Sequence, residues 1–336
     1  MRKLLPISHF WVPVIILSAL IALLAGCARV EVPQTEKNKA LVARAWDVIV
    51  NQGNFAAADQ IFAADYVYHS PGNPDLTGVA EAVTQPLSTL RTAFPDIHFT
   101  MEDTIAEGDL VVGRFTWTGT HQGELMGIQP TNNKVTVTGI LVARIAEDKI
   151  AEKWGYEDAL GLMQQLGAAP ARGKGDYTWG PPPSEVTGAP GTPEENKAMY
   201  NRGVEMWNEK NLDLIDEMLS ADFVNHDPTW PEVTGFESYK KWIADWFESA
   251  PDMMITVDAL VAEGNKVAGR WTALWTDSTG LAGNPPTNQE IVVTGIDIYR
   301  IADGKVVEEW WAKDFLGVMK QAGMMPAPEE AGKETP

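Results

Sequence analysis

A tryptophan and an aspartate four residues apart occur twice in this chain, as Trp154 with Asp158 and as Trp310 with Asp314. In an extended strand, alternate residues share a face, so Asp158 would lie on the same face as Trp154 and Tyr156. Burial among apolar groups raises the pKa of a carboxyl group, which makes both aspartates candidate proton donors and acceptors near neutral pH. The alternative is that each aspartate ends a strand and caps the helix that follows.

Two histidines and two arginines also occupy matching places in the two segments. His69 and His226 each follow a short apolar run, where an imidazole could lie at the mouth of a cavity or have an ordinary structural role. Arg114 and Arg270 interrupt apolar strands, and a buried guanidinium needs an anion beside it. That anion could be a ligand carboxylate or a carboxylate of the chain itself.

His121 breaks this correspondence, because the second segment has Asp277 at the same place. Either the two segments bind different ligands, or the position lies on a loop on which no function depends. Aromatic side chains, including Trp154, Trp310 and Tyr156, could line a cavity for a flat apolar ligand. Core packing is the usual role of such residues.

These correspondences indicate a tandem repeat. The Trp, Asp and Arg pairs are each separated by 156 positions (310 − 154, 314 − 158 and 270 − 114). A length of 336 residues fits two domains of ordinary size. We therefore expect a first repeat at 36–167 and a second repeat at 194–323. A Pro/Gly-rich linker at 168–193 would join them, and a disordered tail would follow at 324–336.

Within each repeat the hydrophobic pattern changes from helix-like to strand-like. In the first repeat, apolar residues at 41–49, 55–62 and 79–90 have the spacing of one helical face. Pro86 should kink the third helix or mark its late start. From 98 to 158 apolar residues alternate, with turn residues between strand-length segments. This order predicts an α+β fold in which three N-terminal helices pack on a curved antiparallel sheet, once per repeat.

The N-terminus has the features of an export signal. It has a basic start, an apolar run from Phe10 to Leu24, and then Leu24-Ala-Gly-Cys27 with the only cysteine. This segment resembles a bacterial lipoprotein signal, in which 1–27 contains the signal peptide and lipobox and Cys27 is lipidated. An uncleaved transmembrane anchor is the alternative. Both place the soluble part in the cell envelope outside the cytoplasm, after a short tether at 28–35.

The composition restricts the classes of partner. A formal net charge of −20 repels the phosphate backbone, so no nucleic acid is expected to bind. With one cysteine the chain can form no internal disulfide, and each domain must be held by its hydrophobic core. The five histidines are scattered, with no two at the spacing of metal ligands on a helix face, so no metal site is predicted.

Several motifs resemble those of the SnoaL-like polyketide cyclases and the related ester cyclases of the nuclear transport factor 2-like superfamily. They are Phe94-Pro-Asp96, Thr120-His-Gln-Gly123, Gly127-Ile-Gln-Pro-Thr131, Trp154-x3-Asp158 and Gln165-Leu-Gly167. The resemblance covers about 36–167 and 194–323. It implies two cone-shaped domains, each with an apolar cavity at its open end.

The resemblance also implies a chemistry. Asp158 and Asp314 would be general acid/base residues of a ring closure that needs no cofactor, acting on a small hydrophobic carbonyl or ester compound. The cyclases support their Asp with a His on the preceding strand, where this chain has Val142 and Arg144. An Arg144 that faced the cavity would pair with Asp158 and lower its pKa.

Two other functions fit the same features. The pockets could hold a small apolar ligand without changing it, or the chain could be an interaction module in which the two domains form an internal dimer. In each case we expect the domains to pack on each other.

Overall fold

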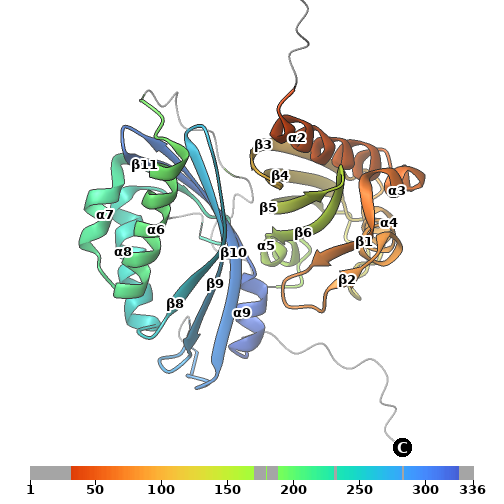
Figure 1. Cartoon of the computed structure of the whole chain (residues 1–336). Coiled ribbons are helices and arrows are strands. Elements are labelled where there is room, and N and C mark those ends of the chain that lie inside the picture. Colours follow the sequence, from red (N-terminus) through yellow and green to blue (C-terminus); the bar gives the residue numbers. More distant parts are fainter. Residues whose placement is uncertain (1–31, 170–178, 180–187, 231–232, 282–283, 325–336) are drawn as a thin grey trace, which may run out of the picture. The chain divides into compact units, whose positions relative to one another are not determined.

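The computed structural model describes residues 32–169, 179, 188–230, 233–281 and 284–324 (Figure 1). The chain divides into two compact units, Met1–Gln34 and Thr35–Pro336, and both repeats belong to the second. The predicted signal peptide and Cys27 lie outside the described residues, as do most of the predicted linker and tail. Over the described ranges, no helix has the length and apolar character needed to cross a membrane.

The helices of the first repeat come mostly before its long strands. Pro86 lies in the first turn of α4, where its missing N–H is tolerated. Because the π-helix η3 runs directly into α4, Pro86 marks a change of helix type rather than a late helix start. The helical elements are α2 (Gln34–Ala45), the π-helix η1 (Trp46–Asn51), the 3₁₀-helix η2 (Phe55–Ala57), α3 (Ala58–Ile61), the π-helix η3 (Ala80–Thr84), α4 (Gln85–Ala93) and, at the end, α5 (Ala159–Gln165).

The first sheet has six strands in the order β2-β1-β6-β5-β4-β3. The long strands are antiparallel as predicted, but β1 runs parallel to β6, so the sheet is mixed. β2, α4 and the strands β3 to β5 all lie between β1 and β6 in the sequence, so no hairpin joins this pair and nothing local requires it to be antiparallel. The strands are β1 (Phe62–His69), β2 (Leu76–Thr77), β3 (His98–Glu107), β4 (Leu110–Thr120), β5 (Lys134–Ala146) and β6 (Lys149–Glu157).

The second repeat has the same arrangement, which confirms the predicted α+β class. Its sheet has the order β7-β11-β10-β9-β8, again with one parallel pair, β7 and β11. Figure 1 shows the first three of its helices covering one face of this sheet. The elements are α6 (Pro193–Glu209), α7 (Asp213–Met218), β7 (Leu219–His226), α8 (Phe236–Ser249), β8 (Met254–Glu263), β9 (Lys266–Thr276), β10 (Glu290–Ala302), β11 (Lys305–Lys313) and α9 (Phe315–Gln321).

Three groups of buried apolar residues stabilise these elements. One lies between helices and sheet in the first repeat, and one lies in the same place in the second. The third combines residues of both sheets, including Ile140 and Val142 from β5 with Ile296 and Ile298 from β10. The strand pairs β3 with β8 and β5 with β11 are also in contact. The two repeats therefore contact each other through their sheets, as predicted.

Candidate functional site

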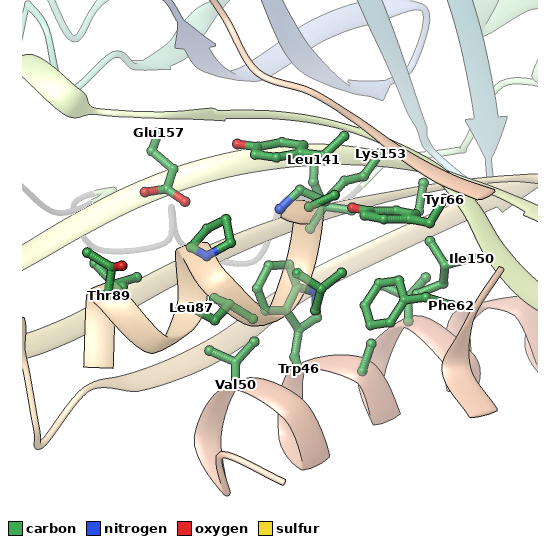
Figure 2. Close-up of a pocket in the computed structure, with 18 of the residues that line it drawn as sticks. Trp46, Val50, Phe62, Tyr66, Leu87, Thr89, Leu141, Ile150, Lys153 and Glu157 are labelled. Atoms are coloured by element: carbon green, nitrogen blue, oxygen red, sulfur yellow. The ribbon is translucent and has the colours of Figure 1, made fainter. Parts of the chain in front are cut away.

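A mainly apolar cavity of about 340 Å³ lies in the first repeat, between the helices and the sheet (Figure 2). Helical elements α2, η1, η3 and α4 supply one wall, and strands β1, β5 and β6 supply the other. Cavities of this size and character are typical sites for small apolar molecules. The lining includes Val42, Trp46, Val50, Phe62, Tyr66, Val83, Leu87, Leu90, Leu141 and Ile150.

Two ionisable side chains, Lys153 and Glu157, enter this cavity from β6. Together with Gly155 they occupy alternate positions, so all three face the inside of the repeat. The strand register places Ala143 of β5 and Tyr68 of β1 on either side of Lys153. Both ionisable side chains are half-buried and line the cavity.

Desolvation in the cavity shifts the pKa values of this pair in opposite directions. Burial lowers the pKa of Lys153 and raises the pKa of Glu157, because leaving water disfavours the charged form of each group. Their mutual attraction opposes both shifts. The Trp117 indole N–H, which donates to Glu157 Oε2 at 3.1 Å, opposes the shift of Glu157. Burial in the cavity therefore acts against the charged form of both groups.

Neighbouring residues fix the position of the Lys153 amine. Its Nζ lies 4.4 Å from the centre of the Tyr68 ring and 5.2 Å from that of Trp46. Gly155 leaves room for the lysine, because a Cβ at this position would lie only 3.1 Å from Lys153 Cε. A larger residue at 155 would displace the lysine side chain.

The predicted acid/base residues, Asp158 and Asp314, cap helices α5 and α9. Asp158 Oδ1 accepts a hydrogen bond from Gly161 N at 2.8 Å, and Asp314 Oδ1 accepts one from Gly317 N at 2.8 Å. Burial raises the pKa of Asp158 to about 6 and also raises that of Asp314, while the cap hydrogen bonds oppose these shifts. Neither residue is part of the cavity lining. Their catalytic role stays a prediction.

Arg144 also lies apart from Asp158. Its Nη2 contacts Glu152 Oε1 at 2.5 Å, an ion pair between neighbouring strands β5 and β6. This contact raises the pKa of Arg144 and lowers that of Glu152. The expected effect of Arg144 on the pKa of Asp158 is therefore not seen.

The other predicted site residues meet where the two sheets contact each other. The His69 ring stacks on Trp154, with centroids 4.6 Å apart and planes within 8°, and the Arg270 Cζ lies 4.7 Å from the Trp154 ring centre. A second group of the same kind takes its histidine and tryptophan from the second repeat and its arginine from the first. The rings of His226 and Trp310 stack with centroids 5.2 Å apart, and Arg114 Cζ lies 4.9 Å from the Trp310 ring centre.

Each of these arginines has a carboxylate partner within the chain. Arg114 Nη1 donates to Glu102 Oε2 at 2.6 Å, and Arg270 Nη1 donates to Asp258 Oδ2 at 3.3 Å. The anion that a buried guanidinium requires is thus supplied by the adjacent strand. Tyr156 belongs to the apolar core between the two sheets.

The two histidines also contact carboxylates, but not equally. His226 Nε2 lies 2.7 Å from Glu308 Oε1, and both side chains are buried. His69 is more exposed: its Nδ1 lies 3.0 Å from Asp75 and its Nε2 is 3.8 Å from Glu152. These contacts place both imidazoles on the sheet face opposite Lys153.

His121 is fully buried and connects two parts of a loop. Its Nδ1 accepts a hydrogen bond from Thr131 N at 3.2 Å, and in the second repeat Asp277 Oδ2 accepts one from Thr287 N at 2.9 Å. A neutral imidazole and a carboxylate thus make the same contact, which explains how they replace each other. Burial lowers the pKa of His121 and so favours the neutral ring that can accept this hydrogen bond.

Sequence reasoning missed Lys153 and Glu157. Alternation along β6 separates its two faces, but it does not say which face borders the cavity, because both are buried. A signal was present: the second repeat has Glu309 and Lys313 at these positions, so the two charges are exchanged. Charges exchanged at inward strand positions indicate that the two interiors differ.

A family model described as SnoaL-like polyketide cyclase matches residues 40–166 and 197–322. The comparison with curated proteins found no match. Similar solved structures include AclR from Streptomyces galilaeus (28% identity, 42% of this chain, 91% of that chain, TM-score 0.38). They also include TsrD from Streptomyces laurentii (26%, 41%, 100%, 0.37) and IdmH from Streptomyces antibioticus (25%, 39%, 98%, 0.33).

Proposed function

The chain belongs to the SnoaL-like polyketide cyclase family, and we propose that its first repeat carries out cyclase-like acid/base chemistry on a small hydrophobic carbonyl or ester compound. Family membership suggests an activity of this kind on a small molecule. The observation that supports it in this chain is the apolar cavity of about 340 Å³ that Lys153 and Glu157 enter. An apolar wall would hold the hydrocarbon part of the compound, and two polar groups would orient its carbonyl group.

Glu157 is the acid/base residue in this proposal. As a carboxylate it removes an acidic proton from the carbon next to the carbonyl, and as an acid it returns a proton to the new alkoxide. The raised pKa suits both steps, because a carboxyl group of ordinary pKa is a weak base at neutral pH. Lys153 lies in the same cavity and binds the carbonyl oxygen, where negative charge develops.

Proton exchange offers a test that needs no knowledge of the natural substrate. A methyl ketone such as 2-acetylnaphthalene exchanges its methyl protons in D₂O, and NMR measures the rate. We expect the protein to accelerate this exchange, and Glu157→Gln to reduce the acceleration on the order of 10²-fold, a typical contribution of general acid/base catalysis. Asp158→Asn is the matched control, because it changes a carboxylate one residue away that does not line the cavity.

The outcomes separate the candidate functions. If proton exchange depends on Asp158 and not on Glu157, then Asp158 is the acid/base residue, as the family resemblance implies. A ketone that binds without accelerated exchange would identify a non-catalytic binding protein. Absence of both binding and exchange would contradict a carbonyl site in this cavity.

We also propose that the protein is lipid-anchored at Cys27 and lies outside the cytoplasm. The support is the sequence Leu24-Ala-Gly-Cys27 at the end of an apolar run. Metabolic labelling with palmitate should mark the wild-type protein and not Cys27→Ser, and only the wild type should sediment with membranes. An unlabelled wild-type protein would contradict the anchor.

A further inference from the structure

We infer that Lys153 is a covalent binding site, at which Nζ forms an imine with an aldehyde or ketone that enters the cavity of the first repeat. The inference rests on the proposed function, since the same cavity must admit a carbonyl compound. It adds a chemical step: the lysine bonds to the carbonyl carbon instead of only contacting the oxygen.

The position of Lys153 suits a nucleophile. Its Nζ lies between the rings of Tyr68 and Trp46 in a mainly apolar cavity. Among the residues that the structure describes, no carboxylate lies within salt-bridge distance of this amine. Burial in the cavity lowers the pKa of this amine, although Glu157 and the two ring faces attract its charged form. A lower pKa makes the neutral amine, whose lone pair can attack a carbonyl carbon, easier to reach.

Other lysines of the chain have the opposite environment. Lys313 occupies the inward position of β11 that corresponds to Glu157, and its Nζ forms a buried ion pair with Asp227. Lys266 pairs with Asp103 at 2.6 Å. Such ion pairs hold the amine against a carboxylate instead of leaving it open to a ligand. Lys313 is therefore a matched control within the same molecule: a buried lysine in the same fold that should not react.

The covalent step is a condensation without an oxidant or reductant. The Nζ lone pair forms a bond to the carbonyl carbon, and a proton moves from nitrogen to the carbonyl oxygen, giving a carbinolamine. The carboxyl group of Glu157 then protonates the hydroxyl group, the C–O bond breaks and water leaves, while the nitrogen lone pair forms the C=N bond. The products are a protonated imine on Lys153, a carboxylate on Glu157 and one water molecule.

These products are arranged for the next step of the proposed function. A protonated imine withdraws electrons more strongly than a carbonyl group, so protons on the neighbouring carbon become more acidic. The condensation leaves Glu157 as a carboxylate in the same cavity, ready to remove such a proton. Gly155 contributes by leaving space for the lysine side chain.

Reductive trapping tests the imine directly. The full-length protein is incubated with 2-naphthaldehyde and sodium cyanoborohydride, digested, and analysed by mass spectrometry. We expect the naphthylmethyl adduct on Lys153 at an occupancy at least about tenfold above that on Lys313 and on exposed Lys241. Lys153→Arg should remove this adduct while keeping a cation, and Gly155→Ala should lower its yield by displacing the lysine.

A binding measurement distinguishes a cavity that binds the compound without forming an imine from a cavity that does not bind it at all. Tryptophan fluorescence reports binding of 2-naphthalenemethanol, which cannot condense with an amine. If the alcohol binds but Lys153 is trapped no better than Lys241, the imine is wrong and the proposed function stands. If 2-naphthoate binds far more tightly than the alcohol and no adduct forms, Lys153 is an ammonium that binds anions. If no naphthyl compound binds, the proposed function fails as well.

Discussion

The two repeats have the same fold but different interiors. The first contains a cavity of about 340 Å³, whereas the two spaces described between the helices and the sheet of the second measure about 50 Å³ and about 10 Å³. Two inward strand positions account for much of this difference: Ala143 and Gly155 in the first repeat correspond to Tyr299 and Trp311 in the second. Both large residues are buried against the helices. Side-chain volume at a few positions thus decides whether this fold encloses a site or a packed core.

The ionisable residues of the second interior lie against one another. Glu309, which corresponds to Lys153, is buried beside Asp297, and Tyr200 donates a hydrogen bond to Asp297. Burial raises the pKa of Asp297 to about 7 and raises that of Glu309 well above its ordinary value. Tyr239 and Tyr299 add further hydrogen bonds to Glu309.

The two copies of the domain therefore differ in what their interiors do: the first has room for a ligand, and the second is a packed core that stabilises the fold. The second interior is filled by aromatic rings and by a buried cluster of acids and tyrosines, so it has little room for a ligand. The first interior keeps an amine and a carboxyl group that face empty space. We therefore expect substitutions in the second interior to change stability, and substitutions in the first to change binding and chemistry.

Removing a ring from each interior should give the largest contrast. Trp311→Ala should lower the free energy of unfolding by about 3–5 kcal/mol, because it leaves a cavity in a packed core. Trp46→Ala is the matched control: this ring is only half-buried and borders space that is already empty, so we expect less than half of that loss. Urea denaturation measures both. Equal losses would contradict the distinction between a core and a site.

Making the first interior resemble the second should remove its site. In Gly155→Trp an indole would occupy the space of Lys153 and part of the cavity, so we expect affinity for 2-acetylnaphthalene to fall by about 100-fold, or about 2.7 kcal/mol. Gly167→Trp is a control at an exposed position, where an added Cβ would meet no neighbour within 4 Å. Since Gly167 has a φ of 77°, this control is expected to cost some stability, but not affinity.

The buried acids should make the second repeat less stable in alkali. The pKa of Asp297 rises from 3.8 to about 7 on folding, so the native state binds more protons between these values. Its stabilising contribution is complete below pH 3.8 and is lost as the pH rises through 7. We expect the free energy of unfolding to fall by about 2 kcal/mol from pH 5.5 to pH 8.

Asp297→Asn should flatten this dependence, since an amide does not titrate in this range. The lowered pKa values of Asp96, Asp252 and Glu152 act with the opposite sign, but they matter only in more acidic solution. Urea denaturation at the two pH values checks the prediction. An unchanged pH dependence in Asp297→Asn would show that other groups cause it.

The sequence was sufficient for the fold but not for the interior of the site. Offsets of 156 residues located both repeats, and periodicity located their helices and strands, because each element has a buried face. The parallel pairing of β1 with β6 was missed, since pairing across a long crossover leaves no local pattern. Trp154 was placed on one strand face with Tyr156, but the sequence did not show that a second sheet would cover this face.

The helix caps, which both repeats share, should give the smallest and most equal effects. Asp158→Ala and Asp314→Ala each remove an acceptor for a backbone N–H, so each should cost about 1 kcal/mol of stability. Asp158→Asn and Asp314→Asn should cost much less, because asparagine also caps helices well. Thermal unfolding of the four variants tests whether the caps are equivalent. If Asp158→Asn kept its stability but lost ketone proton exchange, Asp158 would be catalytic as well as a cap, and the two repeats would differ at this position too.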